Sequence, residues 1–226
     1  ALLAAGCAGA MSGGASTVFH APEAGEAHLR NIRQLTFGGN NAESYFSRSG
    51  KQLIFQRQEQ VDAGCDQQYV MNSDGSNVRR VSNGRGRTTC GFFYANDQRI
   101  LYSSTFQHDS ACPTPPDRSR GYVWPLDHLE IYTSRLDGSD PRALTANGAY
   151  NAETTLSPDG KRLIFTSTMD GDIELYTMNI DGTDQRRLTN RLGYDGGAWF
   201  SPDGTRIVWR AAYPVTAELS YGPIPP

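Results

Sequence analysis

The chain has 226 residues, a formal net charge of -3 and a pI near 5.8. Its 38% hydrophobic and 10% aromatic content is that of a globular domain of ordinary size. No apolar run approaches the roughly 20 residues that span a bilayer, and no net positive charge favours nucleic acid or anionic membrane. The 24 glycines and 12 prolines indicate many turns, as in an all-β protein.

The first segment, residues 1–28, reads as a signal-like, lipoprotein-like or disordered region. It opens "ALLAAGCAGAMSGGAS", which is typical of the end of a secretory signal followed by small residues. "LAAGC" resembles a bacterial lipobox, in which Cys7 would be lipidated, although Leu3 lies one place too early. A plain export signal and an accidental Ala/Gly-rich start are the alternatives. Export predicts an oxidising periplasmic or cell-envelope location, with membrane contact only through a lipid on Cys7.

Three sequence elements then recur in one register. The element "RQLT", "RRVS", "RALT", "RRLT" places its apolar residues at spacings of 46, 63 and 44: Leu35, Val81, Leu144 and Leu188. The element around "KRLIF" does so at 46, 64 and 44: Ile54, Ile100, Ile164 and Val208. The Asp-Gly element repeats at 63 and 44: Asp74, Asp137 and Asp181.

Each repeat predicts four short antiparallel strands. In the third repeat, "AETTL", "RLIFTS", "IELYTMN" and "QRRLT" are the strands, and Pro-Asp-Gly or Asp-Gly sequences supply the turns between them. We expect hairpin turns at three dipeptides: Asp159-Gly160, Asp181-Gly182 and Asp203-Gly204. Four antiparallel strands in about 44 residues form one blade of a β-propeller. The predicted fold class is therefore all-β, a propeller of about three and a half four-stranded blades.

The wording "SPDGKRLIFTS…DIELYTMNIDGTDQRRLT" resembles the WD-like repeat of TolB-type propellers and extends over roughly Ile32–Tyr213. The first two repeats depart from it, because "SRSGK" lacks Pro-Asp and "ANDQR" lacks Pro and Gly. We assign 29–213 to blades, with "IRQLTF" as a lone outer strand, and 214–226 to a Pro-rich tail or truncated end. We expect an incomplete stretch of a longer propeller, whose end blades expose sheet faces.

The second repeat is about 19 residues longer than the third, because it contains an insertion, Phe106–His128. This topology predicts that Cys65, Cys90 and Cys112 lie on one face of the propeller. We expect a disulfide between two of them, with Cys65–Cys90 favoured because both begin strands of adjacent blades. Buried free thiols are an alternative. A zinc site with His108 or His128 matches no ligand spacing, so we predict neither metal nor cofactor.

Acidic residues begin several first strands on the same face: Glu43, Glu153 and Asp195. Their repeated position predicts carboxylates that converge near the channel mouth, where they bind a ligand, cation or peptide. The alternative is that they cap local loops. We add insertion residues to this predicted binding face: His108, Asp109, Tyr122 and Trp124. Pro113, Pro115 and Pro116 restrict the insertion, which lowers the entropy lost on docking.

No catalytic motif occurs in the chain: no Gly-x-Ser-x-Gly, His-Glu-x-x-His, phosphate loop or dinucleotide fingerprint. We therefore predict a non-enzymatic scaffold that binds a protein or peptide at the cell envelope, as resemblance to TolB-type proteins implies. One alternative is the amino-terminal propeller of a prolyl-oligopeptidase-like peptidase. A second is a propeller lyase or sugar-binding protein.

Overall fold

A computed structural model describes residues 18–60, 64–119, 121 and 123–214. All the regular structure in these residues is β-sheet, so the predicted all-β class is confirmed. The strands are β1 (Val18–His20), β2 (Ile32–Gln34), β3 (Asn40–Phe46), β4 (Gln52–Gln58), β5 (Gln67–Asn72), β6 (Arg79–Arg80), β7 (Thr88–Tyr94), β8 (Arg99–Ser104), β9 (Glu130–Arg135), β10 (Arg142–Ala143), β11 (Asn151–Leu156), β12 (Arg162–Ser167), β13 (Glu174–Asn179), β14 (Arg186–Arg187), β15 (Tyr194–Phe200) and β16 (Ile207–Ala212). None of the described residues forms a helix able to cross a membrane.

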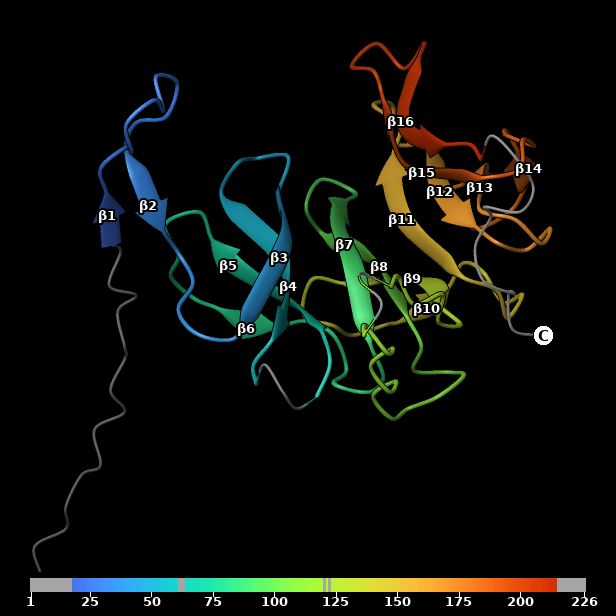
Figure 1. Ribbon diagram of the computed structural model, residues 1–226, viewed down its shortest axis with the longest axis horizontal. Helices are drawn as coiled ribbons and strands as arrows, with labels where there is room; N and C mark the ends of the chain where they lie inside the picture. The colour runs from blue at the N-terminus through green and yellow to red at the C-terminus, as the bar shows by residue number, and fades with distance from the viewer. Residues whose placement is uncertain (1–17, 61–63, 120, 122, 215–226) are drawn as a thin grey trace, which may run out of the picture.

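The strands form successive antiparallel blades, which follow one another through the molecule (Figure 1). Blade 1 is β3-β4-β5-β6, blade 2 is β7-β8-β9-β10 and blade 3 is β11-β12-β13-β14. Blade 4 has two described strands, β15 and β16. Strand β7 contacts both β3 and β11, and β11 contacts β15, so the first strands are the inner strands around one axis. The repeat register thus predicted the blade boundaries.

The predicted Asp-Gly hairpins are all present. At the first of them the Gly160 amide donates to the Ser157 carbonyl at 2.9 Å, and an Asp159 carboxylate oxygen accepts the Lys161 amide at 3.1 Å. Gly160 has φ +73, a left-handed conformation in which glycine has no Cβ penalty. The turns at Gly182 and Gly204 repeat the amide-to-carbonyl bond at 2.9 and 2.8 Å.

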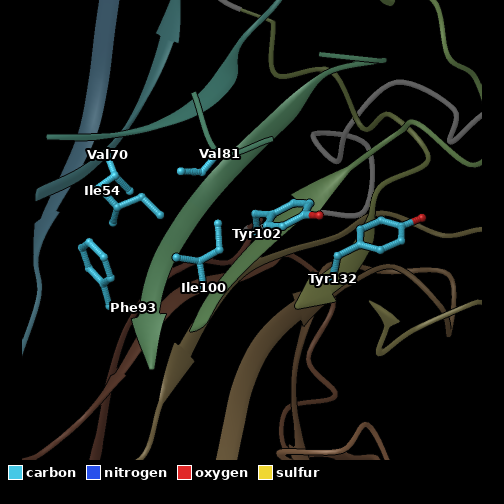
Figure 2. Packing of buried hydrophobic residues seen from close by; sticks show 7 residues of the cluster. All are labelled: Ile54, Val70, Val81, Phe93, Ile100, Tyr102 and Tyr132. Atoms are coloured by element: carbon cyan, nitrogen blue, oxygen red, sulfur yellow. The ribbon is translucent and has the colours of Figure 1, made fainter. Parts of the chain in front are cut away.

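The core lies between the blades rather than inside a single sheet. Figure 2 shows the cluster that joins blades 1 and 2: Ile54, Val70, Val81, Phe93, Ile100, Tyr102 and Tyr132. A second cluster joins blades 2 and 3, where Leu101 and Ile131 pack with Leu163 and Phe165. Each such side chain contributes roughly 1.5–3 kcal/mol when fully buried. The near-continuous apolar centres of β4, β8 and β12 suit second strands that are buried on both faces.

The two ends of the chain add features to the predicted pattern. β2 is not alone, because β1 pairs with it antiparallel (Val18 opposite Gln34); β1 lies within the segment 1–28, where no strand was expected. Strand β16 is exposed on both of its faces, since the consecutive residues Val208 and Trp209 are 67% and 42% accessible. The exposed sheet face expected of the end blades is therefore present at blade 4. It is absent at blade 1, where Leu53, Phe55, Tyr69 and Met71 are buried. Cys7 and residues 215–226 lie outside the described residues.

Candidate functional site

One face of the propeller carries the insertion, and we call it the insertion face. It is made of the β4–β5, β8–β9 and β12–β13 loops together with the connections that enter β7, β11 and β15. Backbone bonds join these segments: the Gly86 amide donates to the Ser110 carbonyl and the Thr88 amide to the Asp66 carbonyl, both at 2.8 Å. The opposite face is formed by the short Asp-Gly hairpins. The insertion, which is the long β8–β9 connection, therefore lies on this face.

A disulfide joins Cys65 to Cys112, with the two Cα atoms 5.6 Å apart. A bonded pair was expected, but the favoured Cys65–Cys90 pairing is wrong. Cys90 is a buried free thiol in the third position of β7, where it lines the channel axis, whereas Cys65 lies in the outer β4–β5 loop. The bond instead ties the insertion of blade 2 to blade 1.

The other end of the insertion reaches blade 4. The Trp124 ring, 39% exposed, lies 6.0 Å from the Tyr194 ring, and the Arg210 guanidinium lies over both rings at 5.7 and 4.8 Å. Nearer its end the insertion is fixed to blade 2 by an ion pair between Asp127 and Arg87. The insertion therefore crosses the face from blade 1 to blade 4, held at both ends.

The remaining insertion residues have mixed positions. His108 and His128 come together with ring centroids 4.3 Å apart, and His128 also bonds the Gly148 carbonyl. Asp109 accepts the Ala111 amide at 2.8 Å, so its carboxylate closes a local turn. Tyr122 lies outside the described residues. Within the described part of the chain, no three His, Cys, Asp or Glu side chains are grouped to hold a metal ion.

At the axis, Glu43, Cys90 and Glu153 occupy equivalent positions of three successive inner strands. Each sits in a β-bulge with left-handed backbone, at φ 47, 54 and 56 respectively; the fourth equivalent is Gly197, at φ 63. Such φ values strain residues other than glycine, and bulges redirect side chains. The bulges direct these three side chains into one axial cavity of about 60 Å³. The sequence did not reveal that Cys90 belongs with the two glutamates.

Asp195 does not join them, which corrects the predicted alignment. Its register partner is Ala211, so Asp195 is equivalent to Asn151, two positions before the bulge. The residue is completely buried and its Oδ1 accepts bonds from Trp209 Nε1 and the Tyr213 hydroxyl, both at 2.7 Å. Its carboxylate therefore holds the fourth blade together instead of facing the axis.

The two axial carboxylates have different surroundings. Glu153 accepts bonds from the Thr166 hydroxyl and the Gly197 amide, both at 2.8 Å, so it links blade 3 to blade 4. Glu43 is solvent-accessible, yet desolvation by the blades raises the pKa of its carboxyl group. A hydrogen bond with Cys90 opposes this shift and the nearby Glu153 charge adds to it. Burial raises the pKa of the Cys90 thiol well above its ordinary value, so that thiol stays protonated.

Three aromatic rings from different blades meet across the axis beside these carboxylates. The Tyr45 ring lies 5.7 Å from Phe92 and 5.5 Å from Trp199, and the last two are 5.4 Å apart. With these rings in place, a cavity of about 60 Å³ accommodates about two water molecules at roughly 30 Å³ each. The axial cavity is therefore too small for a sugar or a peptide, and the accessible surface is the insertion face.

Residues 125–213 match the family model of the TolB beta propeller domain. This part of the chain is therefore similar to TolB propellers. The fold is similar to that of a protein assigned as TolB from Agrobacterium tumefaciens (18% identity, TM-score 0.58, 76% of this chain and 54% of that one). It is also similar to TolB from Acinetobacter baumannii (17%, 0.61, 79% and 39%). The TolB-like chain thus spans about half of their length or less.

A third similar structure is a puromycin-hydrolysing peptidase from Mycobacterium tuberculosis (18% identity, TM-score 0.52, 74% of this chain and 24% of that one). At these identities the likeness shows the fold alone. No curated protein matched the sequence.

Proposed function

We propose that this TolB-like propeller is a non-enzymatic scaffold of the bacterial cell envelope that binds a protein or peptide partner on its insertion face. The observation that carries the proposal is the insertion itself, Phe106–His128, which crosses from blade 1 to blade 4 and is fixed at both ends. A loop held in this way loses little entropy when a partner docks on it. Loops on a rigid scaffold are also where binding residues concentrate.

The exposed side chains of the insertion suit a protein or peptide. Trp124 and Val123 are 39% and 38% exposed, and tryptophan is enriched among residues that anchor interfaces. Arg210, stacked against Trp124, adds a cation at the same place. The hairpin face instead offers short turns whose Asp side chains bond their own backbone, as Asp159 does. On the insertion face, a partner would find apolar area and charge side by side at Trp124 and Arg210.

A second proposal is that the blades belong to a larger peptidase whose catalytic domain is not in this sequence. Its support is the structural similarity to the puromycin-hydrolysing peptidase, of which this chain covers 24%. The two proposals differ in the gene sequence that follows Pro226: a Gly-x-Ser-x-Gly domain there supports the peptidase. The scaffold is supported if further propeller repeats follow Pro226 and the chain then ends.

The binding proposal is tested by removing part of the insertion. Deleting Ser110–Arg120 also removes Cys112, so the deletion is made in a chain carrying Cys65→Ser, and Cys65→Ser/Cys112→Ser with the intact insertion is the matched control. Partners are recovered from envelope extract with the wild-type chain, purified, and titrated against each variant. We expect affinity at least about tenfold lower for the deletion than for the control, a difference of ~1.4 kcal/mol.

Two exposed residues of the opposite face supply the counter-test. Lys51 and Lys161 lie in equivalent β3–β4 and β11–β12 hairpins and are exposed. Lys51→Glu and Lys161→Glu should leave affinity unchanged. If these reversals weaken binding while the insertion deletion does not, the partner binds the hairpin face and the proposal is wrong.

A further inference from the structure

A second cavity lies beside the disulfide, at the outer side of blade 1, and has a volume of about 310 Å³. The two disulfide cysteines form part of its wall together with Ser110 of the insertion. Two arginines from different strands also line it, Arg57 of β4 and Arg80 of β6. Its size is that of small-molecule sites, about 300–1,000 Å³, in contrast to the axial cavity.

Neither arginine has an acidic partner among the described residues. The Nε atom of Arg57 is buried with no hydrogen-bond acceptor, and its guanidinium lies 5.8 Å from the centre of the Tyr69 ring. The Arg80 guanidinium lies on Gly84, where an added Cβ would come within 3.0 Å of its atoms. A buried N–H without an acceptor is costly, so an acceptor supplied by a ligand would stabilise this arrangement.

Blade 3 shows what the same positions look like when they are neutralised. Strand pairing makes Arg80 equivalent to Arg187, because they lie opposite Tyr69 and Tyr176 respectively. Arg187 donates to the completely buried Glu174 at 2.6 Å and lies 3.5 Å from Asp170. The arginine of blade 3 is thus fixed by carboxylates of its own blade.

Blade 1 differs from blade 3 by two replacements, and each of them makes the local charge more positive. Gln67 stands where blade 3 has Glu174, and Arg57 stands where it has Ser167. The Gln67 amide cannot receive Arg80 instead, because its oxygen accepts the Ser82 hydroxyl at 2.7 Å and the Gly84 amide at 3.0 Å. At the position of the carboxylate that fixes Arg187 in blade 3, blade 1 therefore has an amide that is already engaged.

One carboxylate does line the cavity, and it is already engaged. Glu59 accepts the hydroxyl of the buried Tyr69 at 2.8 Å, the role that Asp170 has toward Tyr176 in blade 3. Burial raises the pKa of Tyr69 and Glu59 raises it further, whereas the charges of Arg80 and Arg57 lower it. Both guanidinium groups therefore act on the same small space. Among the described lining residues, one carboxylate therefore stands against two guanidinium groups.

We propose that this cavity, between Arg57, Arg80 and the Cys65–Cys112 disulfide, binds a small molecule through an oxyanion group, a carboxylate or a phosphate. Guanidinium groups present planar, paired donors that match both oxyanions. The ligand's oxygens take the place that Glu174 has in blade 3. This site is separate from Trp124 and goes beyond the partner binding proposed above.

Isothermal titration of the oxidised full chain with inorganic phosphate and with succinate tests the proposal, at constant ionic strength in sodium chloride. We expect saturable binding of at least one probe, and the tighter probe identifies the ligand as phosphate or carboxylate. Arg57→Gln and Arg80→Gln should each weaken it roughly tenfold or more, since a charged hydrogen bond contributes about 1.5–3 kcal/mol.

Arg206→Gln is the matched control, because Arg206 is an exposed arginine of the β15–β16 hairpin on the opposite face, and it should bind as the wild type does. Circular dichroism shows whether each variant is folded. Arg80 is exposed on the outer strand, so Arg80→Gln remains informative if Arg57→Gln fails to fold. No saturable binding of either probe, or equal affinity in the wild type and Arg80→Gln, would overturn the proposal.

Discussion

Loss of the Cys65–Cys112 disulfide should destabilise the chain strongly, because the bond closes a long loop between two blades. The two cysteines are 47 positions apart. In the chain-entropy description, a loop of that length restricts the unfolded chain by about 4 kcal/mol at 25 °C. The loop contains the last two strands of blade 1 and the first two strands of blade 2. The native structure already places the cysteine Cα atoms 5.6 Å apart, so the bond is made without moving either blade.

The assay is urea unfolding of the oxidised wild type and of Cys65→Ser/Cys112→Ser, followed by tryptophan fluorescence. With a slope of about 2 kcal/mol/M, the midpoint should fall by roughly 2 M. The control is the reductant itself: it should lower the wild-type midpoint to that of the double variant and leave the double variant unchanged. Midpoints of oxidised wild type and double variant that coincide would refute the reasoning, as would a reductant effect of equal size on both.

Three further predictions test local contacts. Arg187→Gln should destabilise the chain by about 2 kcal/mol, because it leaves the completely buried Glu174 without its cation. Arg80→Gln removes an arginine that has no such partner among the described residues, so it should change stability by less than about 0.5 kcal/mol. Chemical denaturation measures both changes. Glu43→Gln should flatten the pH dependence of unfolding. Because the fold raises the pKa of Glu43, the stability of the wild type falls as the pH rises above the ordinary pKa of 4.5. If the melting temperatures of wild type and variant change in parallel above pH 4.5, the carboxyl group is not desolvated. Gly182→Ala and Gly160→Ala should both lower the free energy of unfolding by about 1–2 kcal/mol, because both glycines have left-handed backbone. Gly182→Ala should lower it by about 1–3 kcal/mol more, since its new Cβ would lie 2.6 Å from a backbone oxygen, whereas the Cβ at Gly160 would meet no atom. Equal losses would show that this close approach relaxes freely.

The blades were predictable from the sequence because their information is local and repeated. Asp159-Gly160 and Asp181-Gly182 each set a hairpin through their own backbone preferences, and the repeats around them fix the register. The axial site was only partly predictable. The Ser-Pro-Asp-Gly hairpins of blades 3 and 4 are 44 residues apart, which makes Gly197 the equivalent of Glu153, whereas Asp195 lies two positions earlier and is equivalent to Asn151.

The cysteine pairing and the arginine cavity depended on contacts between distant segments. Strand positions alone favoured Cys90 as a partner, but the path of the insertion back toward blade 1 decides that Cys112 reaches Cys65. The sequence shows that Gln67 stands where blade 3 has Glu174. Only the strand register shows that Arg80 and Arg187 are equivalent, so that Arg187 has a carboxylate partner at this position and Arg80 does not.

The central claim, that a partner binds the insertion face, is tested most directly by site-specific photo-crosslinking in the native envelope. A photoreactive amino acid replaces Val123, which is 38% exposed in the insertion, or Lys161, which is exposed in a hairpin of the opposite face. We predict a discrete crosslinked species from position 123 and none from position 161. A crosslink from position 161 with none from position 123 would contradict the claim.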